Sequence, residues 1–256
     1  MKTKKLITLT LLLFFYMGIS TALASGHIVV SNVVGSQEGN WIVIKYDLSH
    51  SGDGEIFIEL EFAANGTDFT VVSPKTERIN GDINIVDPGT GKEIRWQAAA
   101  ALAGQFSASA KTRVKADYRF VGVAGHPEVI LDKTSGLMWP QNALMTKGVN
   151  SIDDNGLRSW YDAKKWVEDM NSGINANFGF TDWVMPSIAQ LSTLYYSKDK
   201  VNGPPGHPFI NYFSEYWYWT SYYYGSSYYR YDPLENPSDS QSRNTIDKVW
   251  AVRSSD

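Results

Sequence analysis

The chain has 256 residues and no cysteine. It therefore cannot form a disulfide, a thiolate metal site or an iron–sulfur cluster, and it has no cysteine nucleophile. Any fold must be held by apolar packing, hydrogen bonds and ion pairs. Hydrophobic residues make up 43% of the sequence and charged residues 20%, which is typical of globular proteins with one or two domains. The net charge of −4 argues against general nucleic-acid binding, which needs clustered cations.

Residues 1–24 have the pattern of a secretory signal peptide. Lys2, Lys4 and Lys5 precede an apolar run, and Ala22-Leu23-Ala24 matches a cleavage site. A membrane anchor is the alternative, but the apolar run is shorter than the roughly 20 residues that a spanning helix needs. We expect cleavage after this motif. The mature protein would then be periplasmic, at the cell surface or extracellular, with no membrane span.

Residues 25–116 contain short apolar segments separated by turn sequences. Their side chains alternate in character, and the clearest case is 55–62, where Ile56, Ile58 and Leu60 are expected on the core face. Short strands at this spacing, without a convincing helix, predict an all-β sandwich of two sheets. The expected strands are 28–34, 41–48, 55–62, 93–97 and 107–114.

A family resemblance accompanies this strand pattern. It is carried by Ser31–Val33, Ile44–Leu48, Asn80–Ile83 and Pro88–Trp96. In this order the segments resemble the fibronectin type III-like modules of bacterial exported proteins, whose sandwich is immunoglobulin-like. The resemblance implies that the first half of the chain is a spacer or a presenting module.

Residues 117–256 have a different pattern, in which helices occur among short strands. Ser159 with Asp162, and Ser187 with Gln190, have the spacing of capping boxes and predict the starts of two helices. The first helix would bury a stripe of apolar residues three and four positions apart. The result would be an α+β domain with two helices and an antiparallel sheet. The expected strands are 129–131, 137–139, 216–221, 227–231 and 248–253, and the buried stripe is Ala163, Trp166, Val167 and Met170.

Four blocks of this half carry a more specific resemblance. They are Asp132–Trp139, Thr181–Leu191, Tyr216–Ser221 and Val249–Arg253. In sequence and order they resemble the Lcl C-terminal domain family, also known as DUF1566. The resemblance implies a C-type-lectin-like fold. The namesake of the family is a bacterial surface adhesin domain that binds sulfated glycosaminoglycans.

Some positions depart from the family pattern. Val184 replaces a usual Arg, Ala251 replaces a usual Cys, and Trp166 and Val167 occupy the helix where a partner Cys is common. The core must then compensate for a missing cysteine pair by packing. Residues 132–256 also carry 11 Lys and Arg against 14 Asp and Glu, and the cations form no run. Charge therefore does not support a polyanionic ligand, and a neutral glycan or a protein partner is favoured.

Aromatic residues are concentrated near the C-terminus, where 10 of the 16 residues from 216 to 231 are Tyr or Trp. In a strand, Trp217 and Trp219 would share one face, which we expect to belong to the core. The following tyrosines are harder to bury, and they share a hairpin with Gly and Ser. This combination suits recognition, although the alternative is that the rings merely line β-surfaces. The candidate ligand-binding residues are Tyr222, Tyr223, Tyr224, Tyr228, Tyr229 and Arg230.

Catalytic and metal sites have little support in the sequence. The acidic turn 153–156 lacks the alternating ligands of a calcium loop, and 235–237 holds a calcium-lectin tripeptide in scrambled order. His126 and His207 are isolated in Gly- and Pro-containing loops, and a pocket that joins an ionisable pair, such as Asp182 and His207, would favour an enzyme. We expect no catalytic residue, metal or cofactor.

These observations lead to two functional hypotheses. The first is an exported, non-enzymatic binding or adhesion protein that recognises a glycan or an extracellular or envelope protein through its aromatic-rich surface. The second is a structural or assembly component of the envelope, in which the same patch forms a permanent interface.

Overall fold

The computed structural model describes residues 28–52, 54–74, 76–98, 110–145, 158–195, 209–210, 217–232, 238–242, 245 and 247–255. The predicted signal peptide lies outside these residues. The described residues form two compact units. The first comprises 28–52 and 56–117, and the second comprises residues 54 and 55 together with those from 118 onward. Within the described part of the chain, no helix is long and apolar enough to cross a membrane.

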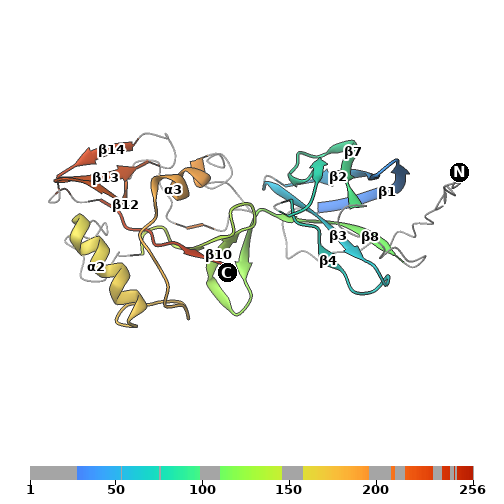
Figure 1. The fold of residues 1–256 in the computed structure, drawn as a ribbon. Helices are drawn as coiled ribbons and strands as arrows, with labels where there is room; N and C mark the ends of the chain where they lie inside the picture. Colours follow the sequence, from blue (N-terminus) through green and yellow to red (C-terminus); the bar gives the residue numbers. More distant parts are fainter. Residues whose placement is uncertain are drawn as a thin grey trace, which may run out of the picture. The chain divides into compact units, whose positions relative to one another are not determined.

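The first unit consists of two sheets. Figure 1 shows β1, β2 and β7 in one layer and β3, β4 and β8 in the other. One sheet has the order β1 (Ile28–Glu38), β2 (Trp41–His50), β7 (Gly89–Trp96) and β5 (Ile79–Gly81). The other has the order β4 (Thr70–Val71), β3 (Ile56–Ala63) and β6 (Asn84–Ile85), and β8 (Lys111–Tyr118) also pairs with β3.

A single apolar core joins the two sheets. Ile44 and Trp96 from one sheet and Ile58 and Leu60 from the other belong to the same cluster of buried residues. The Trp96 ring meets Phe62 edge-on, with ring centroids 5.1 Å apart. The alternation in the sequence therefore identified the core face of β3 correctly. The expected two-layer β arrangement is confirmed at this coarse level.

The last residue of β5, where this strand pairs with β7, must be a glycine. Gly81 has a φ of +96°, and a Cβ on this residue would lie 2.1 Å from the carbonyl oxygen of Glu93. Only a residue without a side chain allows the two strands to approach this closely. The Asn80-Gly81-Asp82 turn of the sequence is therefore fixed by backbone sterics.

The second unit contains two antiparallel sheets and two helices. One sheet has the order β15 (Arg253–Ser254), β11 (Leu137–Pro140), β10 (His126–Asp132) and β9 (Phe120–Val123). The other is built from β12 (Tyr218–Tyr224), β13 (Ser227–Tyr231) and β14 (Ser238–Gln241). The helices are α2 (Trp160–Asn171) and α3 (Ile188–Tyr195). The expected strand 248–253 is reduced to β15 and isolated bridges, which include one between Val252 and Val184.

Both helices begin where the capping residues predicted. Ser187 and Gln190 form a reciprocal capping box at α3, with distances of 2.8 and 3.1 Å between the backbone nitrogens and the side-chain oxygens. At α2 the hydroxyl of Ser159 accepts a hydrogen bond from the backbone N–H of Asp162, at 3.3 Å. Here the carboxylate of Asp162 accepts a hydrogen bond from the Ser159 hydroxyl, in place of the backbone N–H of Ser159 that a full capping box would use. The predicted apolar stripe of α2 is buried as expected.

Strand β12 separates two apolar clusters of the second unit. Tyr218 packs with Trp139 and Trp250 in one cluster, whereas Trp219 belongs to the other with Trp160 and other residues of α2. Both faces of the strand are therefore buried here, and the core is not confined to the tryptophan face. In the second cluster Ala251 lies with Trp166 and Val167. Apolar packing thus occupies the positions where the resembled family often has cysteines.

Candidate functional site

The tyrosine-rich hairpin is formed by β12 and β13, and its rings lie on two faces. Tyr223 stands opposite Tyr228 in the ladder, and their rings stack with centroids 6.1 Å apart. Tyr222 contacts Tyr229, with centroids 4.8 Å apart. Because side chains alternate along a strand, Tyr224 lies on the same side as Tyr222. The hairpin thus divides the predicted cluster into a Tyr223 face and a Tyr222 face.

The Tyr223 face is directed toward helix α2. The Trp160 ring lies 5.6 Å from Tyr223 and 4.8 Å from Tyr228 between centroids. Tyr228 is only 7% exposed, so the prediction that it forms a surface ring is wrong. Its phenol also hydrogen-bonds that of Tyr161 at 2.8 Å. The physical reason is that α2 supplies an aromatic and polar partner that the hairpin sequence alone does not reveal.

Three of the predicted rings are exposed. Tyr222 is 51% exposed, Tyr223 59% and Tyr224 76%, while Tyr229 is partly buried against Tyr222. Exposed rings therefore occur on both faces of the hairpin. Only Tyr223 combines exposure with contacts to α2.

Arg230 is held within the fold. Its guanidinium lies 3.1 Å from Asp239 and 3.2 Å from Asp247, and it stacks over the Trp217 ring at 4.3 Å. Burial raises the pKa of Asp247 to about 6, although the guanidinium acts in the opposite direction. These contacts give Arg230 a structural role in the sheet, where the sequence suggested a ligand contact.

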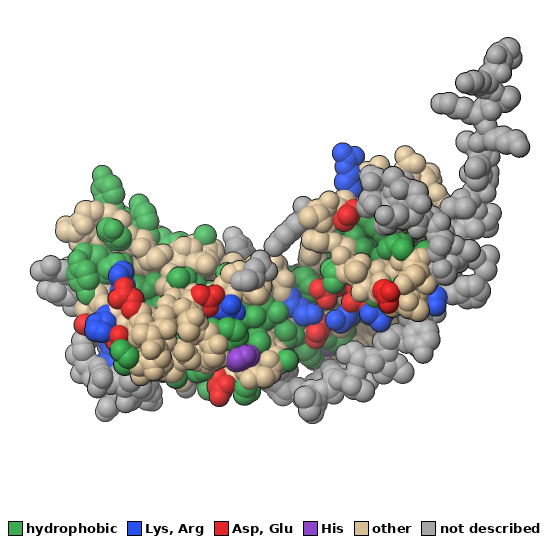
Figure 2. All heavy atoms as spheres, turned by 60° about the horizontal axis from the view of Figure 1, so that its bottom comes forward, with side chains coloured by type: hydrophobic (Ala, Val, Ile, Leu, Met, Phe, Trp, Pro, Cys, Tyr) green, Lys and Arg blue, Asp and Glu red, His purple; other side chains and the backbone are tan. Residues whose placement is uncertain are grey.

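A pocket of about 270 Å³ lies between α2 and the Tyr223 face. Its walls are mainly apolar and aromatic. In Figure 2, hydrophobic side chains gather at the left-hand end, where Figure 1 places α2, β12 and β13, beside a small group of charged side chains. The lining residues are Trp160, Lys164, Val167, Glu168, Asn171, Trp183, Val184, Met185, Ser221 and Tyr223.

Several polar groups of the pocket walls are already paired within the protein. The indole N–H of Trp160 donates to the backbone carbonyl of Thr220 at 2.9 Å. Asn171 is paired with the backbone of Trp183 through both its amide oxygen and its amide nitrogen, each at 2.8 Å. The indole N–H of Trp183 donates to the carbonyl of Asn177 at 2.8 Å. The walls therefore present mostly apolar surface to a ligand.

The charged residues of the lining are Lys164 and Glu168, one turn apart on α2. They form an exposed ion pair, and the hydrogen bond with Glu168 raises the pKa of Lys164. Val184 is 49% exposed and adds apolar surface. The Arg that the resembled family has at position 184 would place a cation here.

Sequence reasoning did not identify most of this pocket. Val167 belongs to the predicted apolar stripe and Trp160 follows the predicted helix cap Ser159, while Trp183, Val184 and Met185 lie in the second family block. Their apolar character indicated a core. The available signal was the family block itself, which supplies three consecutive lining residues.

Residues 128–253 match the family model of the Lcl C-terminal domain. The match covers most of the second unit and includes α2, the tyrosine hairpin and every residue that lines the pocket. It leaves out β9, Arg119 and Glu55. No curated protein matches the chain.

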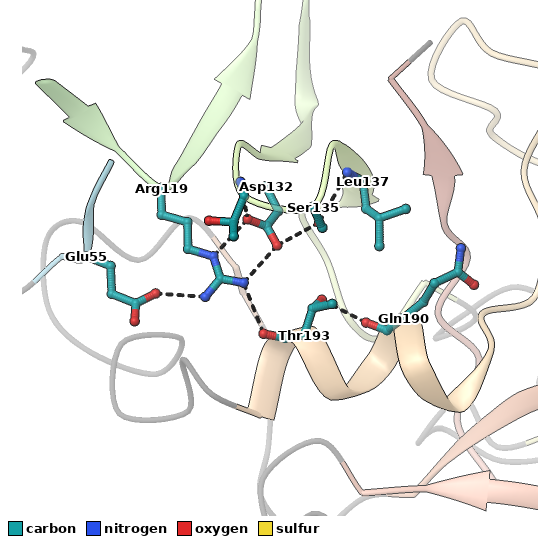
Figure 3. Close-up of polar contacts among 8 residues, drawn as sticks. Glu55, Arg119, Asp132, Ser135, Leu137, Gln190 and Thr193 are labelled. Carbon is teal, nitrogen blue, oxygen red and sulfur yellow. Dashed lines mark hydrogen bonds and ion pairs between the residues drawn. The ribbon is translucent and has the colours of Figure 1, made fainter. Parts of the chain in front are cut away.

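The first block of the Lcl match forms a buried polar turn. Asp132 is fully buried, and its carboxylate accepts hydrogen bonds from Arg119 at 2.8 and 2.9 Å (Figure 3). It also accepts from the backbone N–H of Thr134 at 3.0 Å and from the hydroxyl of Ser135 at 2.8 Å. The Asp and Ser of this block thus close the tight turn between β10 and β11 and do not form a ligand site.

Arg119 links this turn to two other segments. Figure 3 shows its guanidinium between Asp132, Glu55 and the backbone of α3. It lies 2.9 Å from the Glu55 carboxylate and donates to the Thr193 carbonyl at 3.1 Å. The cluster fixes α3 to the sheet that contains β10.

The metal and catalytic candidates of the sequence lie only partly among the described residues. Within them, no group of three His, Asp or Glu side chains could hold a metal ion. His126 hydrogen-bonds the Phe178 carbonyl at 2.7 Å and packs against Phe180. Asp182 pairs with Arg253 at 2.7 Å, and this hydrogen bond lowers its pKa. His207 and the acidic segments 153–156 and 235–237 lie outside the described residues.

Proposed function

We propose that this chain is an exported, non-enzymatic binding protein whose second unit recognises a glycan or a protein at the pocket between α2 and the hairpin. The observation that carries this proposal is the pocket of about 270 Å³ walled by Trp160, Trp183 and the exposed Tyr223. Aromatic rings give a large and rigid contact area at a low cost in conformational entropy.

The chemistry of the pocket favours binding over catalysis. Lys164 and Glu168 neutralise each other, and the raised pKa of Lys164 keeps the amine protonated near neutral pH. A general base needs a pKa near the working pH, so this lysine is poorly suited to proton transfer. Asp182, the acid that could have revived an enzyme hypothesis, is paired with Arg253.

The organisation of the chain fits a presented binding domain. We propose that the first unit is a fibronectin type III-like spacer and that the second has a C-type-lectin-like fold. The support for the spacer is its two-sheet core together with the sequence resemblance. The support for export is the signal-like pattern of residues 1–24. Cell fractionation would test export, since a mature protein that stays in the cytoplasm would contradict it.

The binding proposal can be tested on glycan and matrix-protein arrays with the chain that lacks residues 1–24. Tyr223→Ala should lower the affinity by at least about tenfold, as is usual for a central contact. Tyr224→Ala is the matched control, because it removes an exposed tyrosine from the other face of the same hairpin. Circular dichroism and thermal melting would show that both variants remain folded. No ligand on either array, or equal losses in the two variants, would refute the proposal.

A second candidate is a structural or assembly component of the envelope. It is favoured by Tyr222 and Tyr224, which are exposed on the face away from α2 and could form a permanent interface. Size measurement in solution separates the two candidates. A stable oligomer in which Tyr222 and Tyr224 become protected would favour the structural component.

A further inference from the structure

We infer that the pocket between α2 and the hairpin accepts one apolar, ring-sized side chain of a protein partner and does not accept a sugar. This inference rests on the proposed function, because it names the kind of ligand that the same pocket recognises. It follows from the size of the pocket, the pairing of its polar groups and the charges at its rim.

The size of the pocket suits a single anchor residue. Its volume of about 270 Å³ lies just below the roughly 300–1,000 Å³ that is usual for small-molecule sites. Val184 and Tyr223 line the pocket and are also exposed, so the apolar surface continues from the interior to the rim. A small apolar pocket with an apolar surround is the arrangement in which protein partners insert a central aromatic or aliphatic residue.

Pairing within the protein removes many of the contacts that a sugar would need. The indole N–H groups of Trp160 and Trp183 and the amide of Asn171 are bonded internally. The backbone N–H and C=O of Val184 are both paired with Val252. The backbone N–H of Ser221 donates to the carbonyl of Pro186. Each of these groups is therefore used before a ligand arrives.

A sugar and an apolar side chain respond differently to such walls. A sugar ring carries several hydroxyls, and every hydroxyl that is buried without a partner opposes binding. The remaining polar side-chain groups of the lining are the hydroxyls of Ser221 and Tyr223 and the ion pair of Lys164 and Glu168, and all four residues are exposed, so these groups are not in the buried part of the wall. An apolar ring needs no hydrogen-bond partner and gains from removal of its surface from water.

The charges at the rim complement a polypeptide. The ammonium of Lys164 can donate to a carbonyl oxygen, and the carboxylate of Glu168 can accept from an N–H. The two groups lie side by side on one face of α2. A peptide offers a C=O and an N–H beside every side chain, so an anchored residue brings both complementary groups to this pair.

The first experiment selects random 12-residue peptides on the chain that lacks residues 1–24. The selected peptides are then measured against the Val184→Arg variant, because an Arg at this exposed lining position would fill the pocket and add a charge. Ile174→Arg is the matched control, since Ile174 is exposed but does not line the pocket. We expect the selected peptides to share one Trp, Phe or Leu. Its replacement by Ala should weaken binding at least tenfold, as should Val184→Arg, whereas Ile174→Arg should have less than a threefold effect.

The second experiment compares two defined probes, indole and methyl β-glucopyranoside, by saturation-transfer NMR at millimolar concentration. We expect a signal from indole that Val184→Arg abolishes, and none from the glucoside. A glucoside signal lost in Val184→Arg, without one from indole, would overturn the inference but leave the proposed function intact. Peptides that bind without a shared apolar residue, or that tolerate Val184→Arg, would also overturn it. No binding of peptides, indole, glucoside or arrayed ligands would overturn both.

Discussion

Removing the negative charge of Asp132 should strongly destabilise the second unit. Asp132→Asn preserves the size of the side chain but leaves it uncharged. The two carboxylate oxygens of Asp132 together accept four hydrogen bonds, from Arg119, Thr134 and Ser135. In the variant one of these oxygens becomes an NH₂ group, which can only donate. Arg119 would then be a buried cation whose remaining described ion pair is the one with the partly buried Glu55.

The expected loss can be estimated from burial. The side chains of Arg119 and Asp132 are 6% and 0% exposed. Breaking a buried ion pair by removing one partner destabilises proteins by about 3–5 kcal/mol, because the remaining charge is left desolvated. The matched control is Asp169→Asn, which breaks the exposed pair with Lys165. Exposed pairs contribute about 0–1 kcal/mol to stability, so this variant should remain close to the parent.

Urea unfolding followed by tryptophan fluorescence measures this difference. Seven of the nine tryptophans lie after residue 130, so the signal reports mainly the second unit. With a slope of about 2 kcal/mol per molar urea, the midpoint of Asp132→Asn should fall by about 1.5–2.5 M. A decrease below about 0.5 M, or one equal to that of Asp169→Asn, would refute the claim that this cluster holds the unit together.

Three further predictions concern pH, a turn and a helix cap. Burial raises the pKa of Asp247 to about 6, so the folded state binds a proton at this carboxylate more tightly than the unfolded state does. The contribution of Asp247 to the free energy of unfolding should therefore fall by about 3 kcal/mol as the pH rises from about 4 to 6. Urea midpoints at pH 4, 5, 6 and 7 should show this decline in the parent but not in Asp247→Asn, and parallel curves would contradict it. Gly81→Ala should lower the free energy of unfolding of the first unit by more than about 1 kcal/mol, because the new Cβ would collide with the backbone at Glu93. Calorimetry that shows an unchanged melting temperature for this unit would be incompatible with the clash. Ser187→Ala should lower the free energy of unfolding by about 1 kcal/mol, because α3 loses its N-cap. Hydrogen exchange at the backbone N–H of Gln190 should accelerate, and an unchanged exchange rate would count against the cap.

Local periodicity predicted much of the fold. The apolar stripe from Ala163 to Met170 lies on the buried face of α2, and the predicted strand 227–231 has the same bounds as β13. These features depend on residues within a few positions of one another. The same is true of the cap of α3, where the partners are three residues apart.

The candidate site was only partly predictable because its contacts are distant in sequence. Composition identified the tyrosines, but Tyr161, which pairs with Tyr228, lies 67 positions away from it. Arg230 was selected as a nearby cation, yet its partner Asp247 lies 17 residues further along the chain. No local pattern indicates that α2 lies beside the hairpin, and this placement decides which rings are exposed and where the pocket lies.

Residue Glu55 gives the second unit a discontinuous boundary. It lies between β2 and β3 in the chain, yet it belongs to the second unit, where its carboxylate contacts the guanidinium of Arg119 and its carbonyl accepts the Arg119 backbone N–H at 2.9 Å. A fragment cut at residue 117 would lose both contacts, and one cut to the family match would also lose Arg119 itself. The second unit is therefore not a continuous segment that a single cut can isolate, and domain swaps should carry the Glu55 segment with it.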